Sequence, residues 1–173
     1  DELGRLAGSL NNMAISLHSS FTKLEDKEWL KTGLAGLNRM MLGNENLKAL
    51  STNVINYLAE YTHSEVGAFY YVNENFELAL QDGYSLTVTE ANQIIKMGEG
   101  VVGQVAKQKK YSVINNVSPT DIFIQFSSSG ITPKSLVVFP VVYEDAIKAV
   151  FELGSLENYT ELDYDFLEQA SYN

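Results

Sequence analysis

Residues 135–153, SLVVFPVVYEDAIKAVFEL, decide the fold. Two apolar runs, 135–142 and 146–153, lie on either side of the polar tripeptide Tyr143-Glu144-Asp145. Runs rich in Val, Ile and Phe that are separated by a short polar turn are typical of two antiparallel strands. This stretch therefore predicts a long β-hairpin.

The sequence upstream of this hairpin predicts a second one. Residues 66–72 (VGAFYYV) and 76–80 (FELAL) are rich in aromatic and β-branched residues, and a short Asn73-Glu74-Asn75 turn separates them. Before them, leucines and valines at helical spacing predict a helix that begins near Asn44 and ends near His63. Gly43 and Asn44 are suited to end the preceding helix and to cap this one.

The remaining elements complete an α+β order. Thr87 and Glu90 form a capping-box pattern for a short helix that would reach Ile94 and Ile95, and a second short helix is expected after Gly103. Residues 111–115 predict a strand, and Thr160 with Asp163 predicts the start of a closing helix. The order helix, hairpin, short helices, strand, hairpin, helix predicts a central antiparallel sheet with flanking helices.

A long coiled-coil-type helix is predicted ahead of this body, because residues 1–42 contain no proline and carry a narrow apolar stripe. The stripe has the alternating spacing of three and four, with a stutter and a polar break near Lys27-Glu28. About forty residues would span roughly 60 Å, so the stripe calls for a partner helix. We expect a parallel homodimer, with folding back onto the chain's own body as the alternative. The expected seam residues are Leu3, Leu6, Leu10, Met13, Leu17, Leu30, Leu34, Leu37 and Met41.

Composition excludes several kinds of chemistry. The chain has no cysteine, which excludes disulfides, zinc–thiolate sites, thiol catalysis and a thiol-linked chromophore. Its net charge of −10 and its lack of a basic stripe argue against nucleic-acid binding. His18 and His63 are the only histidines and lie on different elements, so no metal site is expected. Without a nucleophile arrangement or phosphate cradle, we expect no catalytic residues and no enzyme activity in this fragment.

Several strings resemble the GAF family over nearly all of residues 45–170. They are GAFYYV at 67–72, LAL at 78–80 followed by Gly83-Tyr84, GEGVVGQVA at 98–106, and the final hairpin. Residues 98–103 also match the dinucleotide pattern G-x-G-x-x-G, but the segment 93–97 is predicted to be helical and no βαβ unit surrounds it. The resemblance implies a sheet with helices on one face and a small-molecule pocket on the other.

A second resemblance concerns the front of the chain. Asp1-Glu2-Leu3-Gly4 resembles the start of the second helix of a HAMP domain, and residues 28–34 are similar to linkers that join HAMP helices to GAF domains in bacterial sensor kinases. It implies a partial HAMP helix at 1–27, a connecting signalling helix at 28–43 and a GAF domain at 44–173. The parent would then be a membrane-bound histidine kinase of a two-component system, with this fragment soluble on the cytoplasmic side of the inner membrane.

These inferences predict a sensory and relay module that binds a small molecule or transmits helix motion to an output domain beyond residue 173. The alternative is a ligand-free dimerisation spacer whose pocket is filled by its own aromatic residues. A haem, a free metabolite or no ligand at all is left open, and the membrane is reached only through segments outside this chain. The candidate pocket residues are Tyr70, Leu80, Val102, Gln104, Phe123, Phe126, Ser127 and Ser128.

Overall fold

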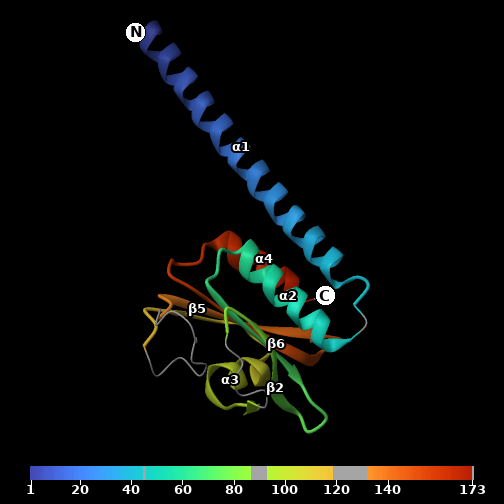
Figure 1. The fold of residues 1–173 in the computed structure, drawn as a ribbon. Helices are drawn as coiled ribbons and strands as arrows, with labels where there is room; N and C mark the ends of the chain where they lie inside the picture. Colours follow the sequence, from blue (N-terminus) through green and yellow to red (C-terminus); the bar gives the residue numbers. More distant parts are fainter. Residues whose placement is uncertain (45, 87–92, 119–131, 173) are drawn as a thin grey trace.

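A six-stranded antiparallel sheet forms the centre of the protein (Figure 1). The computed structural model describes residues 1–44, 46–86, 93–118 and 132–172. The strand order is β3-β2-β1-β6-β5-β4, so β1 and β6 lie in the middle. The predicted hairpins are β1–β2 and β5–β6, which confirms the α+β class. The strands are β1 (Val66–Val72), β2 (Glu77–Tyr84), β3 (Ile94–Lys96), β4 (Ser112–Asn115), β5 (Ser135–Tyr143) and β6 (Ala146–Ser155).

Helices cover the two faces of the sheet unequally (Figure 1). Helices α2 (Leu47–Tyr61) and α4 (Glu161–Ser171) lie on one face with the end of α1 (Glu2–Met41), whereas α3 (Gly100–Gln108) lies on the other. Each face has its own apolar core. We call the first the helix side, with Phe69, Phe139 and Phe151, and the second the α3 side, with Tyr70, Leu78 and Val102.

The capping of the helices agrees in part with the sequence predictions. The side chains of Thr160 and Asp163 form the predicted capping box at the start of α4. The cap of α2 is Asn46 rather than Asn44, because the Asn46 carboxamide oxygen accepts a hydrogen bond from the Ala49 amide at 2.9 Å. Asn44 instead donates to the Met40 carbonyl oxygen at the end of α1.

The prediction that a short helix reaches Ile94 and Ile95 is wrong, because Ile94–Lys96 forms strand β3. These residues pair with β2, and Ile95 lies opposite Leu78 with only 4% of its surface exposed. A three-residue edge strand is too short to show a period of two in the sequence, so local propensity could not identify it. Thr87 and Glu90 lie outside the described residues.

Helix α1 is continuous through Lys27-Glu28 but has two different environments. Residues 2–28, which we call the arm, project away from the body (Figure 1), and the five seam residues in the arm are 56–76% exposed. Residues 29–41, the docked segment, pack on α2 and α4. Within the described residues, no helix is long and apolar enough to cross a membrane.

The docked segment packs closely because two glycines let α2 approach α1. The Tyr57 hydroxyl donates to the Gly33 carbonyl oxygen at 2.9 Å, and the Tyr61 hydroxyl donates to the Trp29 carbonyl oxygen at 2.5 Å. Trp29 also stacks on Tyr61, with ring centroids 4.7 Å apart. A Cβ atom at Gly33 would collide with the Tyr61 ring, and one at Gly36 would collide with the Tyr57 hydroxyl.

This packing uses the second half of the expected seam inside one chain. Leu37 is 4% exposed, and Leu30, Leu34 and Met41 pack against the helix-side core. The docked segment and α2 thus form the antiparallel hairpin that the sequence left as an alternative. The narrow apolar stripe is enough to pack the docked segment on α2, because Gly33, Gly36 and the tyrosines of α2 provide the remaining contacts between the two helices.

The docked segment yields a test of stability. We expect Gly33→Ala to lower the free energy of unfolding by about 1–3 kcal/mol, because the added methyl group must displace the Tyr61 ring. Gly8→Ala is the control, since its Cβ would lie in open space on the arm and should be neutral or mildly stabilising. Urea unfolding of both variants measures the difference. Equal effects would contradict the close approach of the two helices.

Candidate ligand-binding site

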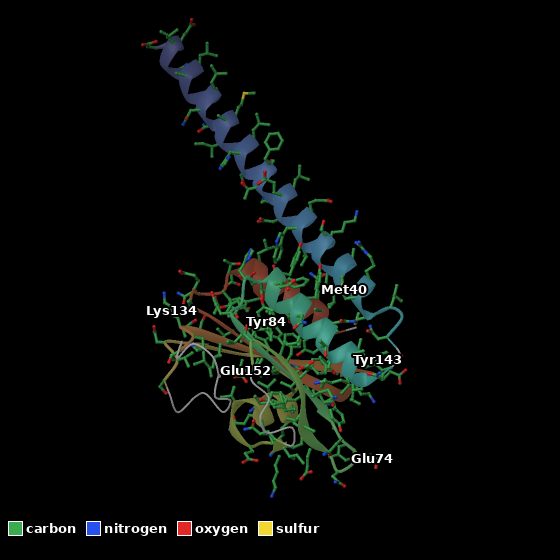
Figure 2. The ribbon with its side chains drawn as sticks, viewed as in Figure 1. Met40, Glu74, Tyr84, Lys134, Tyr143 and Glu152 are labelled. Atoms are coloured by element: carbon green, nitrogen blue, oxygen red, sulfur yellow. The ribbon has the colours of Figure 1, made fainter. Side chains whose placement is uncertain are left out.

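Two polar side chains lie among the apolar residues on the α3 side of the sheet. Along a strand, alternate side chains point to the same face. Ala68 and Tyr70 of β1 therefore face the same side as their partners on β6, Glu152 and Val150. Tyr70 and Glu152 are diagonal neighbours on adjacent strands, close enough for long side chains to interact. Figure 2 shows Glu152 on the side of the sheet that faces α3.

The Tyr70 side chain is completely buried, and its hydroxyl has no hydrogen-bond partner among the described residues. Burial raises the pKa of this hydroxyl well above its ordinary value, and the nearby Glu152 raises it further. The group is therefore a neutral phenol at physiological pH. Leaving such a donor unpaired in a core costs about 1–3 kcal/mol. The Tyr70 hydroxyl therefore destabilises the folded protein unless a group from outside the described residues pairs with it.

The Glu152 side chain is also buried, with 5% of its surface exposed. It lies between Ala68 of β1 and Val138 of β5, which pair with it on either side. Burial in these surroundings raises the pKa of the carboxyl from 4.5 to about 7. At neutral pH the group can therefore exchange between its charged and neutral forms, which is typical of functional carboxyl groups.

A β-bulge next to Tyr70 keeps a second carboxylate away from this face. The register moves from Phe69 opposite Asp82 to Tyr70 opposite Leu80, so Gln81 is the extra residue. Without the bulge, Asp82 would follow Leu80 onto the α3 side. With it, Asp82 pairs with Phe69 on the helix side.

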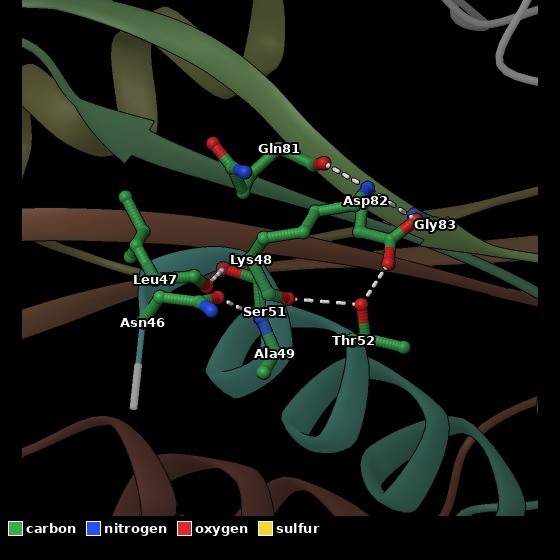
Figure 3. Close-up of polar contacts among 9 residues, drawn as sticks. All are labelled: Asn46, Leu47, Lys48, Ala49, Ser51, Thr52, Gln81, Asp82 and Gly83. Carbon is green, nitrogen blue, oxygen red and sulfur yellow. Dashed lines mark hydrogen bonds and ion pairs between the residues drawn. The ribbon is translucent and has the colours of Figure 1, made fainter. Parts of the chain in front are cut away.

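The displaced Asp82 is held by the start of α2 (Figure 3). Lys48 lies 3.3 Å from its carboxylate and donates to the Gln81 carbonyl oxygen at 2.8 Å, while the Thr52 hydroxyl donates to the other carboxylate oxygen. Burial alone would raise the pKa of Asp82, but the hydrogen bonds from Thr52, Gly83 and Lys48 lower it overall. The Asp82 carboxylate is thus paired within the protein.

The structure gathers three of the predicted pocket residues. Tyr70, Leu80 and Val102 belong to the α3-side core, with exposures of 0%, 8% and 2%. Gln104 is exposed on α3, so its side chain does not join them. The other four, Phe123, Phe126, Ser127 and Ser128, lie outside the described residues.

Sequence reasoning missed Glu152. The signal was a single acidic residue inside the otherwise apolar run Ala149-Val150-Phe151-Glu152-Leu153. Acidic residues are almost never fully buried unless they are paired, so one in a central strand is informative. The residue was not singled out because the strand's two faces could not be assigned from the sequence.

The glycine string at 98–103 has a structural role. A strand, β3, precedes it rather than the expected helix, and α3 follows it. However, β3 and the strand after α3, β4, lie at opposite edges of the sheet, so they do not form a βαβ unit of neighbouring parallel strands. The Glu99 carboxylate accepts a hydrogen bond from the Lys96 amide at 3.0 Å, and a Cβ at Gly103 would collide with the Lys96 carbonyl oxygen. The glycines thus allow α3 to pack against β3.

Comparisons with known proteins agree with this architecture. The family model described as GAF domain matches residues 44–173. Similar solved structures include the GAF domain of an Acinetobacter phosphoenolpyruvate-protein phosphotransferase, with 18% identity, a TM-score of 0.65 and coverage of 82% of this chain and 85% of that one. No curated protein sequence matches the chain significantly.

Two further structures show the range of proteins that share the fold. The free methionine-R-sulfoxide reductase of Neisseria meningitidis, solved with its substrate, is 21% identical with a TM-score of 0.65, and the match covers 82% of this chain and 83% of that one. A putative GAF sensor protein from Burkholderia vietnamiensis is 19% identical with a TM-score of 0.62, covering 82% and 87%. At these identities the likeness concerns the fold.

The raised pKa of Glu152 predicts a pH dependence of stability. Between about pH 4.5 and 7 the folded protein keeps a proton that the unfolded chain releases, so this residue makes stability fall as pH rises. Across this pH window, the free energy of unfolding of the wild type should fall by on the order of 3 kcal/mol relative to that of Glu152→Gln. Urea unfolding at about pH 4.5 and pH 8 measures the difference. Exposed Glu168→Gln is the control, and a pH-independent difference for Glu152→Gln would contradict the burial.

Proposed function

Because the chain belongs to the GAF family, we propose that it is a sensory and signal-relay module whose α3-side face binds a small molecule. The observation that carries this proposal is the buried, unpartnered hydroxyl of Tyr70 beside the buried carboxyl of Glu152. A few polar groups set in an apolar wall are typical of small-molecule sites. A ligand that pairs with these groups would remove the cost of burying them.

The helix side differs from the α3 side in a way that supports this assignment. Its buried polar groups are paired, as in the hydrogen bond of 2.7 Å between the hydroxyls of Tyr159 and Ser64. The unsatisfied Tyr70 hydroxyl is therefore a local feature and not a general property of the core. A ligand-free spacer would gain nothing from this hydroxyl, which is why we favour the sensor over that alternative.

We further propose that the arm connects the domain to a membrane-anchored receptor, with residues 1–27 as part of a HAMP helix and a histidine kinase as the parent. The Asp1 carboxylate accepts hydrogen bonds from the Leu3 and Gly4 amides in the first turn of α1, where the family resemblance places an acidic pair. The fragment itself would carry no catalytic residues and would lie on the cytoplasmic side of the membrane.

The arm is also the proposed dimer interface. Its apolar stripe is exposed, and an isolated helix of this kind gains stability mainly from packing. A second copy of the same arm, aligned in parallel, would bury the stripe with matching heptads. The proposed interface is confined to Leu3, Leu6, Leu10, Met13 and Leu17, because the later seam residues pack within the chain.

The Tyr70 hydroxyl provides a direct test of the sensor proposal. In the ligand-free protein, Tyr70→Phe should be neutral or should raise the free energy of unfolding by up to about 2 kcal/mol, because it removes an unpaired buried donor. Tyr159→Phe is the matched control and should cost about 1 kcal/mol, since that hydroxyl is bonded to Ser64. Urea unfolding measures both. A loss at Tyr70 equal to that at Tyr159 would count against a hydroxyl kept for a ligand.

The dimer proposal has a separate test. Changing Leu6 and Leu10 to glutamate should raise the dimer dissociation constant at least about tenfold, because it would place charges in the apolar contact. Changing Asn11 and Asn12 to glutamate alters the other faces of the same exposed turns and should leave the dimer intact. Sedimentation velocity distinguishes the species. A monomeric wild type at micromolar concentration would contradict the pairing of the arms.

A further inference from the structure

The charge pattern of the α3 side indicates which ligands it can accept, an inference that rests on the proposed function. Among the described residues, the buried side chains on this face include one carboxyl group, one phenol and no basic group. The others are apolar: Ala68, Leu78, Leu80, Ile95, Val102, Val105, Ala106, Val138 and Val150. The buried residues that the structure describes on this face thus supply no positive charge that could pair with an anionic ligand.

A comparison of two acids in this chain shows what is missing at Glu152. The Asp82 carboxylate has Lys48 at 3.3 Å together with the Thr52 hydroxyl, and its pKa is lowered. Within the part of the chain that the structure describes, no cation pairs with Glu152, and burial raises its pKa. A buried carboxylate becomes favourable only when a positive charge and hydrogen bonds compensate for the loss of water. At Glu152 that positive charge would have to come from the ligand.

The net charge of residues 45–173 also favours a positively charged ligand. Residues 45–173 contain seventeen acidic and seven basic side chains, a difference of −10 that equals the net charge of the chain. Such a field raises the local concentration of cations and opposes the approach of anions. The local and the global electrostatics therefore agree.

We propose that the α3 side binds a small organic cation, an amine whose ammonium group donates hydrogen bonds to the Glu152 carboxylate and the Tyr70 hydroxyl oxygen. The hydrocarbon part of the ligand then lies against the apolar residues of β2 and α3, such as Leu78, Leu80 and Val102. The Glu152 carboxylate and the Tyr70 hydroxyl oxygen would then both accept hydrogen bonds from the ammonium group, and the Tyr70 O–H would donate to the same carboxylate. Phosphates and carboxylates would place like charge beside Glu152 and are excluded.

Three probes with one hydrocarbon skeleton test this preference: phenethylamine, 2-phenylethanol and 3-phenylpropionate, which carry a cationic, a neutral and an anionic end group. Each is titrated into the full chain at neutral pH and followed by protein-observed NMR. We expect the amine to shift the amides around Tyr70 and Glu152 and to bind at least about tenfold more tightly than the other two. Glu152→Gln should abolish this preference, whereas Glu168→Gln on the exposed face of α4 should keep it.

The outcomes separate the inference from the proposed function. If the alcohol or the acid binds this face at least as tightly as the amine, or if Glu152→Gln keeps the amine preference, the inference is overturned while a ligand site remains. If no probe shifts these amides at millimolar concentration and Tyr70→Phe is destabilising, both the inference and the ligand site are overturned.

Discussion

The two-residue alternation of the central strands β1 and β6 is the constraint on which the rest of the structure depends. Because both strands are covered on both faces, each side chain is committed to one of two cores. Phe69 and Phe151 point to the helix side, where aromatic packing and paired hydroxyls close the core. Tyr70 and Glu152, one position away on the same strands, point to the α3 side. The same periodicity thus produces one face on which the helices pack and the buried hydroxyls are paired, and a second face on which the Tyr70 hydroxyl lacks a partner among the described residues.

The two faces are connected at defined contacts. Lys48 and Thr52 tie the start of α2 to β2 at the bulge beside Tyr70. At the other edge, the Tyr172 hydroxyl after α4 donates to the Lys109 carbonyl oxygen at the end of α3, at a distance of 2.7 Å. A displacement of α3 would have to break or move this hydrogen bond between Tyr172 and Lys109. A ligand can shift such an arrangement only if it binds one state better than another. The arm continues from the docked segment, which packs on α2 and α4 (Figure 1).

Much of the fold could be predicted from the sequence, because long apolar runs and helix caps leave local signals. The hairpin at 135–153 and the capping box at Thr160 are examples. Strand β3 could not be predicted, since its three residues are held by pairing with β2. The docked segment was ambiguous for a related reason: a narrow leucine stripe serves a coiled coil or an internal hairpin equally well, and Gly33 decides between them only once Tyr61 lies against it. The burial of Glu152 could not be predicted, because the sequence does not show that both faces of β6 are covered.

The central claim is that Tyr70 and Glu152 meet a small molecule on the α3 side of the sheet. The most direct test is a high-resolution crystal structure of the full chain, purified without denaturation and grown without added ligands. The account predicts non-protein electron density within hydrogen-bonding distance of the Tyr70 hydroxyl and the Glu152 carboxyl group. A side chain of the protein itself hydrogen-bonded to both groups, with no space left between them and α3, would contradict it and would favour a filled, ligand-free domain.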